Sequence, residues 1–315
     1  MRVAFLGRKS ELSSINKSMG TLDDQERKRI GQKLNEVRTA VSGHLEEQGD
    51  RALRLEREAR TEDERLDPTL PGRKPRRGRL HPLTQVTDEI IDAFVGIGFK
   101  VVDGPVVETD YYNFEALNMP PDHPARSMHD TLYVETEDPG TIVVRTHTSP
   151  MQIRVMETTP PPLYMVFPGR VARRDEVTPN HLASFMQIEG LVVDQGISFA
   201  DMKGTLEVFA KAIFGPGLEV RIHPSYFPFT EPSAEVYVSC FACDGSGCGT
   251  CRGEGWIEVM GAGMVHPNLF KAVGYPEDIT GFAFGMGVER IAKLRYEIHD
   301  LRTFYENDVR FLERF

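Results

Sequence analysis

Two stretches decide how this chain folds: Gly169-Arg-Val-Ala-Arg173-Arg-Asp-Glu176, which runs on to Phe185-Met-Gln-Ile-Glu189-Gly190, and Gly281-Phe-Ala-Phe-Gly-Met-Gly-Val-Glu289-Arg290. Each stretch places an arginine beside glycines or carboxylates. The planar guanidinium binds phosphate oxygens bidentately and stays charged at any working pH, while glycine lets a backbone approach a ligand closely. Taken alone, either arginine is explained equally well by a surface ion pair. Together they predict a site for a polyphosphate ligand.

The two stretches also differ in the structure expected around them. Arg173 follows a short apolar run, whereas Arg290 follows a Gly-x-Gly-x-Glu pattern that predicts a turn and then begins an amphipathic helix. In this order the stretches resemble motifs 2 and 3 of the class II aminoacyl-tRNA synthetases.

Composition excludes several classes of protein. With 315 residues, 40% of them hydrophobic, the chain is long enough for one large domain with an appendage. No apolar run approaches the roughly 20 residues that span a bilayer. The first residues lack a basic-then-apolar export signal, so we expect a cytoplasmic protein without a membrane segment.

Charge is distributed unevenly along the chain. Residues 1–80 carry a net charge of +5 and residues 81–315 a net charge of −15, from the overall −10. A basic segment attached to an acidic domain is typical of a protein that binds an RNA backbone through that segment. A solvated helix with a basic linker explains the charges equally well.

The first 66 residues predict a helical arm. A long helix is expected from Thr21, which with Asp24 suggests a capping box. Its apolar side chains recur at helical spacing among dense Glu and Arg, as on a coiled-coil surface, so the helix needs a packing partner; they are Ile30, Leu34, Val37, Val41, Leu45, Ala52, Leu55 and Ala59. Prolines and basic residues mark residues 67–80 as a linker.

Residues 81–315 predict an α+β domain around a mainly antiparallel sheet. Helices are expected near His81–Gly98, 150–157 and 198–214. Strands are expected at 99–102, 131–134, 141–145, 163–167, 187–193, 219–223 and 235–238. The strands are dispersed among helices without βαβ regularity. No Gly-x-Gly-x-x-Gly follows a first strand, which argues against a Rossmann fold.

Further motifs follow in order along the chain: Gly104-Pro105, Asn113-Phe-Glu-Ala-Leu-Asn-Met-Pro120, His123-Pro-Ala-Arg126, Arg145-Thr-His-Thr-Ser149-Pro-Met, Pro224-Ser-Tyr-Phe-Pro-Phe-Thr-Glu-Pro232 and Gly261-Ala-Gly-Met-Val-His-Pro267. This series closely resembles the α subunits of bacterial phenylalanyl-tRNA synthetases, most densely over residues 80–315. The resemblance implies a class II catalytic domain that makes phenylalanyl-tRNA(Phe), AMP and diphosphate from ATP, L-phenylalanine and tRNA(Phe), through phenylalanyl-adenylate. It also implies Mg²⁺ and a β subunit in an α2β2 tetramer, without which the chain is inactive.

The resemblance assigns roles to individual residues. Those that match the amino-acid site are His147, Ser149, Gln187 and Glu189. Phe185 matches the residue that stacks on adenine, His181 another nucleotide contact, Arg173 the α-phosphate ligand and Arg290 the ligand of the terminal phosphates. Glu231 matches a Mg²⁺ contact shared with the β subunit.

Residue chemistry agrees with an aromatic substrate. Phe227 and Phe229 lie two apart on an expected strand, so both rings face one side, although ordinary core aromatics are the alternative explanation. Ala283, ahead of an expected turn at Gly285-Met-Gly287, is the small residue that leaves room for a substrate ring. Gln187 and Glu189 share a strand face and suit an ammonium group. A related ligase that changed its substrate remains the rival hypothesis.

Three positions depart from the family pattern. Met186 stands where the family usually has His, and Asp175 is shorter than the class-wide Glu. Family members carry two antiparallel N-terminal helices joined near a Leu-Gly-Lys/Arg-Lys turn. Here that turn is Leu6-Gly-Arg-Lys9, so the first helix is expected to be missing.

The chain's cysteines form two copies of Cys-x-x-Cys-x-Gly-x-Gly within an insertion at residues 240–255; they are Cys240, Cys243, Cys248 and Cys251. Four thiolates with glycines that turn backbone amides towards the sulfurs match a closed, structural Zn²⁺ site. A glycine-rich hairpin with unused thiols is the alternative, and disulfides are less expected in a cytosolic chain. The repeat resembles the zinc region of DnaJ-type chaperones, which supplies a rival function, a zinc-stabilised binding module.

Overall fold

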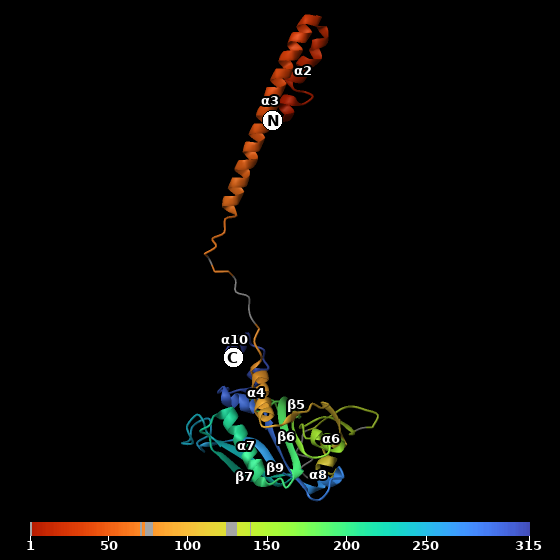
Figure 1. Ribbon diagram of the computed structural model, residues 1–315, viewed down its shortest axis with the longest axis vertical. Helices are drawn as coiled ribbons and strands as arrows, with labels where there is room; N and C mark the ends of the chain where they lie inside the picture. Colours follow the sequence, from red (N-terminus) through yellow and green to blue (C-terminus); the bar gives the residue numbers. More distant parts are fainter. Residues whose placement is uncertain (1, 70, 73–77, 124–130, 139) are drawn as a thin grey trace. The chain divides into compact units, whose positions relative to one another are not determined.

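The computed structural model describes residues 2–69, 71–72, 78–123, 131–138 and 140–315 (Figure 1). The chain divides into two compact units, Met1–Arg76 and Arg77–Phe315. The predicted motif at His123–Arg126 lies partly outside the described residues.

The first unit is helical, with α1 (Arg2–Leu6), α2 (Glu11–Ser18), the 3-10 turn η1 (Met19–Thr21) and α3 (Asp24–Asp63). Asp23 caps α3, because its side chain accepts the Glu26 N–H at 2.8 Å. The predicted capping box at Thr21 and Asp24 was therefore wrong, and the Thr21 hydroxyl instead donates to the Ser18 carbonyl.

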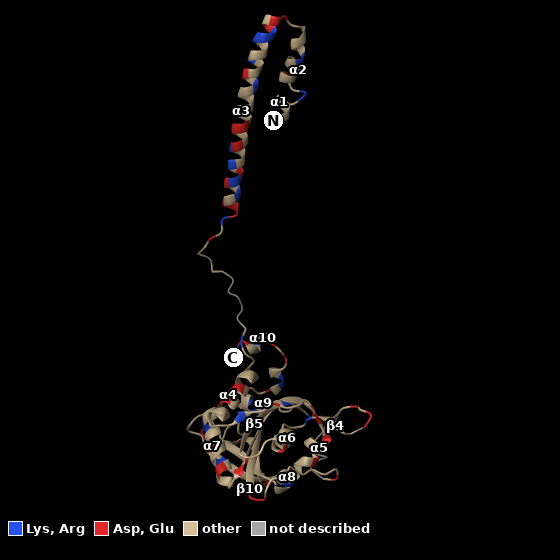
Figure 2. Cartoon of the chain, turned by 45° about the vertical axis from the view of Figure 1, so that its right-hand side comes forward, with Lys and Arg blue, Asp and Glu red and all other residues tan. Residues whose placement is uncertain are grey.

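Residues 2–18 also contain helices that the sequence analysis did not predict. α1 ends at Leu6, where the predicted Leu6-Gly-Arg-Lys9 turn begins, so a helical segment of five residues precedes that turn. Leu12 and Ile15 of α2 line a groove with the α3 residues Ile30, Leu34 and Val37, so α2 covers part of the predicted stripe. Lys, Arg, Asp and Glu are mixed along α3 (Figure 2).

The second unit is built on a seven-stranded sheet within its described residues. In spatial order the strands are β1 (Lys100–Val101), β5 (Leu163–Ala172), β6 (Ser184–Gln195), β10 (Ile279–Gly287), β9 (Trp256–Val265), β8 (Thr230–Ser239) and β7 (Val220–Phe227). β1 is parallel to β5, and the other neighbours are antiparallel. A small second sheet orders β2 (Val107–Thr109), β4 (Ile142–Val144) and β3 (Leu132–Tyr133). The predicted α+β class with a mainly antiparallel sheet is confirmed.

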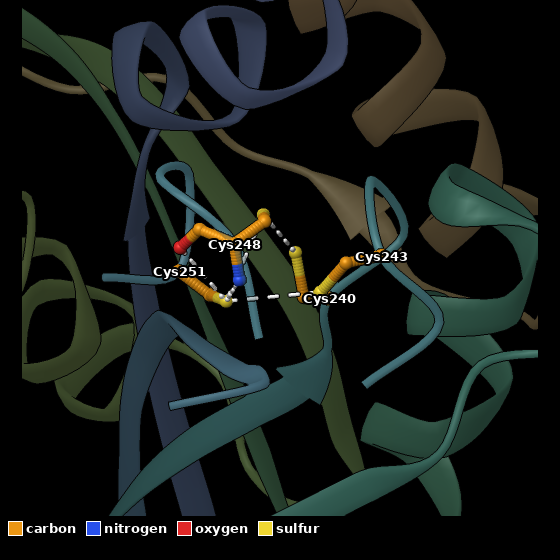
Figure 3. A group of neighbouring side chains, drawn as sticks. All are labelled: Cys240, Cys243, Cys248 and Cys251. Carbon is orange, nitrogen blue, oxygen red and sulfur yellow. Dashed lines mark hydrogen bonds between the residues drawn. The ribbon is translucent and has the colours of Figure 1, made fainter. Parts of the chain in front are cut away.

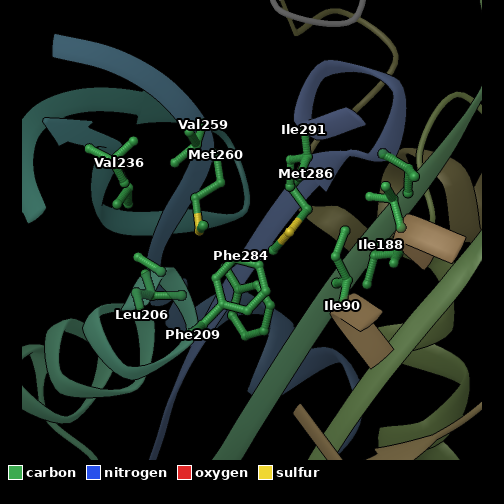
Figure 4. Packing of buried hydrophobic residues seen from close by; sticks show 14 of the residues in the cluster. Ile90, Ile188, Leu206, Phe209, Val236, Val259, Met260, Phe284, Met286 and Ile291 are labelled. Carbon is green, nitrogen blue, oxygen red and sulfur yellow. The ribbon is translucent and has the colours of Figure 1, made fainter. Parts of the chain in front are cut away.

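Strand alternation gives the large sheet two different faces. Even-numbered residues of the central strands, such as Ile188 and Phe284, enter a core covered by α4 (Pro82–Gly96), α7 (Phe199–Phe214) and α9 (Val288–Arg295). The centroid of the Phe284 ring lies 4.7 Å from that of Phe94. Figure 4 shows Phe284 and Ile188 among the packed side chains of this core. A Cβ at Gly190 would approach the Phe284 ring to 2.1 Å, so this packing requires glycine there.

Odd-numbered residues face the opposite side. Leu191, Val193 and Ala283 pack in a second core with α6 (Pro150–Thr158) and α8 (Pro267–Ala272). The short elements α5 (Asp110–Asn113) and η2 (Glu115–Leu117) complete this layer, while η4 (Leu301–Phe304) and α10 (Val309–Leu312) follow α9. Gln187 and Glu189 are odd-numbered too, so the predicted site belongs to this face.

The expected turn at Gly285–Gly287 was wrong, because Gly281–Gly287 lies in the central strand β10. Its glycines are needed for space: a Cβ at Gly281 would lie 2.3 Å from the Val192 carbonyl oxygen, and one at Gly285 would lie 3.0 Å from Glu189 Cγ. β9 was not predicted at all. The helix expected after Arg290 does form, as α9 from Val288.

In the described parts of the chain, no helix combines the length and apolar content that crossing a bilayer requires.

Candidate active site

A cavity of about 320 Å³ opens on the odd-numbered face of the sheet. Its lining includes most residues of the predicted amino-acid site. The lining residues come from β5–β6, α6, the β7–β8 turn, β9 and β10. The predicted residues that line it are His147, Ser149, Arg173, Gln187, Glu189, Phe227, Phe229 and Ala283. Segments separated by more than a hundred positions in the sequence thus share one cavity.

The apolar end of the cavity is formed by two aromatic rings. Phe227 ends β7, but Phe229 lies in the turn before β8, so the prediction that both belong to one strand was wrong. Their rings nonetheless lie side by side, with centroids 6.0 Å apart and planes 14° apart. A Cβ at Gly261 would come 2.9 Å from the Phe227 ring. Ala283, only 4% exposed, adds a small wall.

The polar end centres on the Glu189 carboxylate. It accepts hydrogen bonds from the Ser149 hydroxyl, the Thr148 N–H at 3.0 Å and the Gln152 amide at 3.3 Å. Burial raises the pKa of Glu189, while these donors and the charge of Arg173 act in the opposite direction. The Gln187 Oε1 is buried and has no hydrogen-bond partner among the described residues. This end of the cavity therefore presents the Glu189 carboxylate and the unused Gln187 acceptor to a ligand.

Arg173 continues this polar end towards the edge of the cavity. It follows β5, its Nε donates to the Thr146 carbonyl at 3.0 Å, and its guanidinium carbon lies 5.2 Å from the centroid of the Phe185 ring. Burial lowers the pKa of Arg173, and the charges of Asp175 and Glu189 oppose this effect. Because a guanidinium stays protonated at any working pH, a fixed positive charge stands beside an aromatic face.

Arg290 lies at the first turn of α9 and is held by β9. Its Nε donates to the Glu258 carbonyl at 3.0 Å, and its guanidinium pairs with the Glu258 carboxylate at 3.3 Å. Glu258 itself lines the cavity, so Arg290 lies one residue away from it.

The remaining predicted residues lie outside the lining of this cavity. His181 is exposed in the loop between β5 and β6, where its Nδ1 and the Thr178 hydroxyl are 3.1 Å apart. Phe185 contacts the cavity through Arg173. Glu231 is exposed near the start of β8. Met186 points to the other face, packs against the first core, and its N–H donates to the Glu289 carboxylate at 2.8 Å.

Sequence reasoning missed four polar residues that line the cavity: Gln152, Thr230, Glu235 and Glu258. Gln152 lies three positions after Ser149 on an expected helix, a spacing that places both side chains on one face. This signal was available. Glu258 carried no comparable signal because its strand was not expected.

The four cysteines lie together in the loop that joins β8 to β9 (Figure 3). Their sulfurs all lie within 4.8 Å of one another. The closest separations are 3.7 Å between Cys240 and Cys248 and 3.8 Å between Cys243 and Cys251. Four sulfurs at about 2.3 Å around tetrahedral Zn²⁺ would be about 3.8 Å apart. The donor set and its geometry therefore fit zinc.

Backbone amides point to these sulfurs, as the glycine pattern predicted. Gly247 N–H donates to Cys243 Sγ and Gly255 N–H to Cys251 Sγ, both at 3.2 Å. Burial raises the pKa of Cys240 to about 12. Burial also acts to raise the pKa of Cys251, but the amides of Cys248 and Gly255, together with the thiols of Cys243 and Cys248, lower the value to about 6. The loop thus favours thiolate at some of its sulfurs, the form that binds metal.

Comparison with known proteins covers both units. Residues 65–315 match a family model described as the tRNA synthetases class II core domain (F), and residues 1–61 match the aminoacyl tRNA synthetase class II N-terminal domain. Among curated relatives, the chain is 53% identical over 315 residues to the phenylalanine–tRNA ligase alpha subunit of Caldicellulosiruptor bescii. It is 52% identical over 318 residues to that of Moorella thermoacetica and 51% over 316 residues to that of Acetivibrio thermocellus. Each alignment covers 100% of this chain and 92% of the relative.

Proposed function

The chain belongs to the class II aminoacyl-tRNA synthetases, among the phenylalanine–tRNA ligase α subunits, and on this premise we propose how its cavity performs that reaction. The protein is an aminoacyl-tRNA ligase that acts in protein biosynthesis and serves tRNA(Phe). In our proposal the cavity binds L-phenylalanine and ATP, and phenylalanyl-adenylate forms there before transfer to the tRNA.

The phenylalanine ring fits between the aromatic end and Ala283. Phe227 and Phe229 offer ring faces and edges, and each contact of this kind contributes about 0.5–1.5 kcal/mol beyond burial. The ammonium group then faces Glu189 and the unused Gln187 acceptor. Ser149 and Gln152 hold the Glu189 carboxylate in position. His147, whose ring centroid lies 6.1 Å from that of Phe229, closes the side of the cavity.

ATP extends from this site past Arg173. The adenine stacks on Phe185, Arg173 binds the α-phosphate, Arg290 binds the terminal phosphates, and His181 adds a contact from its loop. The substrate carboxylate attacks the α-phosphorus in line and pyrophosphate leaves. No side chain acts as a nucleophile, so positioning and charge neutralisation lower the barrier.

Magnesium supplies further positive charge at the phosphates when it is bound. The carboxylates of Glu235 and Glu258 line the cavity and would suit this cation, and Glu258 also pairs with Arg290. Glu231 is exposed, which is compatible with the proposed Mg²⁺ contact shared with a β subunit.

Further parts of the proposal concern partners and metal. The relatives are named alpha subunits, which supports a β-subunit partner, and we infer an α2β2 tetramer in the cytoplasm. Zn²⁺ bound by the four cysteines would hold the β8–β9 loop closed as a structural site. A zinc-stabilised binding module alone does not account for the cavity.

The observation that carries the proposal is the pairing of two aromatic rings with the buried Glu189 in one cavity. The test is calorimetric binding to the assembled α and β subunits. We expect L-phenylalanine to bind and 3-phenylpropanoate, which lacks the ammonium group, to bind about 10²-fold more weakly or worse. In Glu189→Gln the two ligands should bind almost equally. Equal binding to the unmodified enzyme would contradict the assignment of the polar end.

A further inference from the structure

The turn formed by Pro228 and Phe229 determines where the two aromatic rings of the cavity lie. It joins Phe227, the last residue of β7, to Thr230, the first residue of β8, and these two residues face each other across the hairpin. A loop of two residues makes few backbone hydrogen bonds of its own. The positions of the rings therefore depend on the groups that bind the polar atoms of this turn.

Two of these polar atoms are bound by residues close to the hairpin. The Ser233 hydroxyl oxygen accepts the Phe227 N–H at 2.9 Å. The N–H of His266, the residue after β9, donates to the Phe229 carbonyl at 3.0 Å. Each bond holds one ring-bearing residue by its backbone.

The carbonyl of Pro228, between the two ring-bearing residues, is bound from a distant part of the chain. Asn118 lies 110 positions earlier, at the end of η2, and its Nδ2 donates to this carbonyl at 2.7 Å. Because Pro228 is buried, leaving a carbonyl there without a donor would cost free energy. Asn118 therefore holds the middle of the turn from outside the lining of the cavity.

Asn118 is itself fixed in position. Its φ of 63° is left-handed, a conformation that asparagine adopts more readily than most residues. Its neighbours Leu117 and Met119 are fully buried, which anchors the backbone on both sides. Asn268 of α8 donates to the Asn118 Oδ1 at 2.8 Å, so the amide is oriented with its Nδ2 towards the turn. The two asparagines form a relay that ends on the Pro228 carbonyl.

We propose that Asn118 is a positioning residue for recognition of the phenylalanine ring. By holding the turn it keeps the rings of Phe227 and Phe229 at their centroid separation of 6.0 Å and within 14° of parallel. A turn released from Asn118 lets these rings move, which weakens their contacts with the substrate ring but leaves the proposed phosphate contacts unchanged. The inference rests on the proposed function and adds to it a residue that the substrate does not touch.

The experiment is ATP–pyrophosphate exchange by the assembled α and β subunits, with phenylalanine and ATP varied in turn. Asn118→Asp keeps the size of the side chain and tolerates the left-handed backbone, but it has no N–H for the Pro228 carbonyl. The KM for phenylalanine should rise about tenfold, while the KM for ATP should stay unchanged. The ratio of kcat/KM for phenylalanine to that for leucine should fall about tenfold, because leucine makes little use of the ring contacts.

Two further variants test the relay. Asn118→Gly keeps the left-handed backbone and removes both hydrogen bonds, so it should act as Asn118→Asp does. Asn268→Ala leaves the Asn118 donor in place but frees its amide to rotate, and the KM for phenylalanine should rise about threefold. Adding Asn268→Ala to Asn118→Gly should raise this KM no further, since both residues act through one relay.

Asn307→Asp is the matched control, because Asn307 has a similar left-handed φ of 56° but is exposed and lies outside the cavity lining. It should leave every KM unchanged. An unchanged phenylalanine KM in the folded Asn118 variants would overturn the inference. Equal rises in the KM values for phenylalanine and ATP would also overturn it, because they would indicate a general distortion of the site.

If neither Asn118 variant folds, Asn268→Ala decides, since Asn268 is exposed on α8. An unchanged phenylalanine KM in that variant would then overturn the inference. An unmodified enzyme without phenylalanine-dependent exchange would instead refute the proposed function.

Discussion

Buried beneath Ser149, Thr148 and Gln152, the Glu189 carboxylate has a pKa raised above its ordinary 4.5 by burial, against the hydrogen bonds it accepts. In our proposal its ionised form is the one that attracts the phenylalanine ammonium. The affinity should therefore fall as pH falls through the raised pKa. Folding responds in the opposite direction: the stability that Glu189 contributes is fully present below its unfolded pKa and is lost as pH rises through the folded pKa.

Calorimetry of L-phenylalanine binding between about pH 8 and about pH 5 measures this dependence. Below the folded pKa the Kd should rise by up to about tenfold for each pH unit. Glu189→Gln should bind weakly with a flat profile. A flat profile in the unmodified enzyme would show that Glu189 does not contact the ammonium group.

Arg173 is the fixed charge at the α-phosphate in our proposal. Arg173→Ala should lower the rate of adenylation about 10²–10³-fold, because a preorganised contact to developing charge is lost. The measurement is phenylalanine-dependent pyrophosphate exchange by the assembled enzyme, with the melting temperature as a control for folding. A folded Arg173→Ala enzyme with normal exchange would refute the motif 2 assignment.

In our proposal Ala283 determines how much room the cavity leaves for the substrate ring. It pairs with Leu191 and Gly263 in the centre of the sheet and lines the cavity. Ala283→Gly removes one methyl group, and one carbon in an apolar pocket changes discrimination by roughly 1–3 kcal/mol. The kcat/KM ratio of para-chlorophenylalanine to phenylalanine should rise markedly, and Ala283→Val should reject phenylalanine itself. A ratio unaltered by Ala283→Gly would place Ala283 outside the ring pocket.

At the scale of elements, β10 explains why part of the fold escaped prediction. Its glycines match the sequence signature of a turn, but at Gly281 the neighbouring backbone of β6, and at Gly285 the Glu189 side chain, occupies the space of a Cβ. At Gly261 and Gly263 of β9, likewise, Phe227 and Thr230 occupy the space that a Cβ would need. Such contacts come from strands distant in sequence, so local patterns do not reveal them. Alternation in β6 did predict that Gln187 and Glu189 share a face.

In the cysteine loop, the local spacing of the residues was enough to predict that the four thiols lie together. Adjacent repeats with glycines after each second thiol bring four sulfurs and their amide donors together within one short loop. By contrast, the partners of Arg290 and Lys293 lie on β9 and the β5–β6 loop, so neither Glu258 nor Asn180 had a sequence signal.

Metal analysis tests this loop. Purified protein should contain about one Zn²⁺ per chain, and Cys243→Ser should lose the metal and melt more than about 5 °C lower. Thr250→Ala, an exposed change in the same loop, is the control and should keep both zinc and melting temperature. Metal-free protein with an unchanged melting temperature would favour a glycine-rich hairpin with unused thiols.

At the scale of the whole molecule, the cavity and the net positive charge lie in different parts of the chain. Every residue that lines the cavity belongs to Arg77–Phe315, whereas the net positive charge lies in residues 1–80. This division suits an enzyme whose acidic body performs the chemistry while its basic arm meets RNA. In our proposal adenylate formation therefore takes place in the second unit, with a β subunit as its partner.

The central claim is that this cavity activates phenylalanine. The most direct measurement is ATP–pyrophosphate exchange by the co-expressed α and β subunits, with each of the standard amino acids supplied in turn. We predict exchange with phenylalanine at least about 10²-fold above that with leucine, since the cavity has two ring contacts that an aliphatic side chain leaves unfilled. Exchange driven by a different amino acid, or by none, would contradict the account.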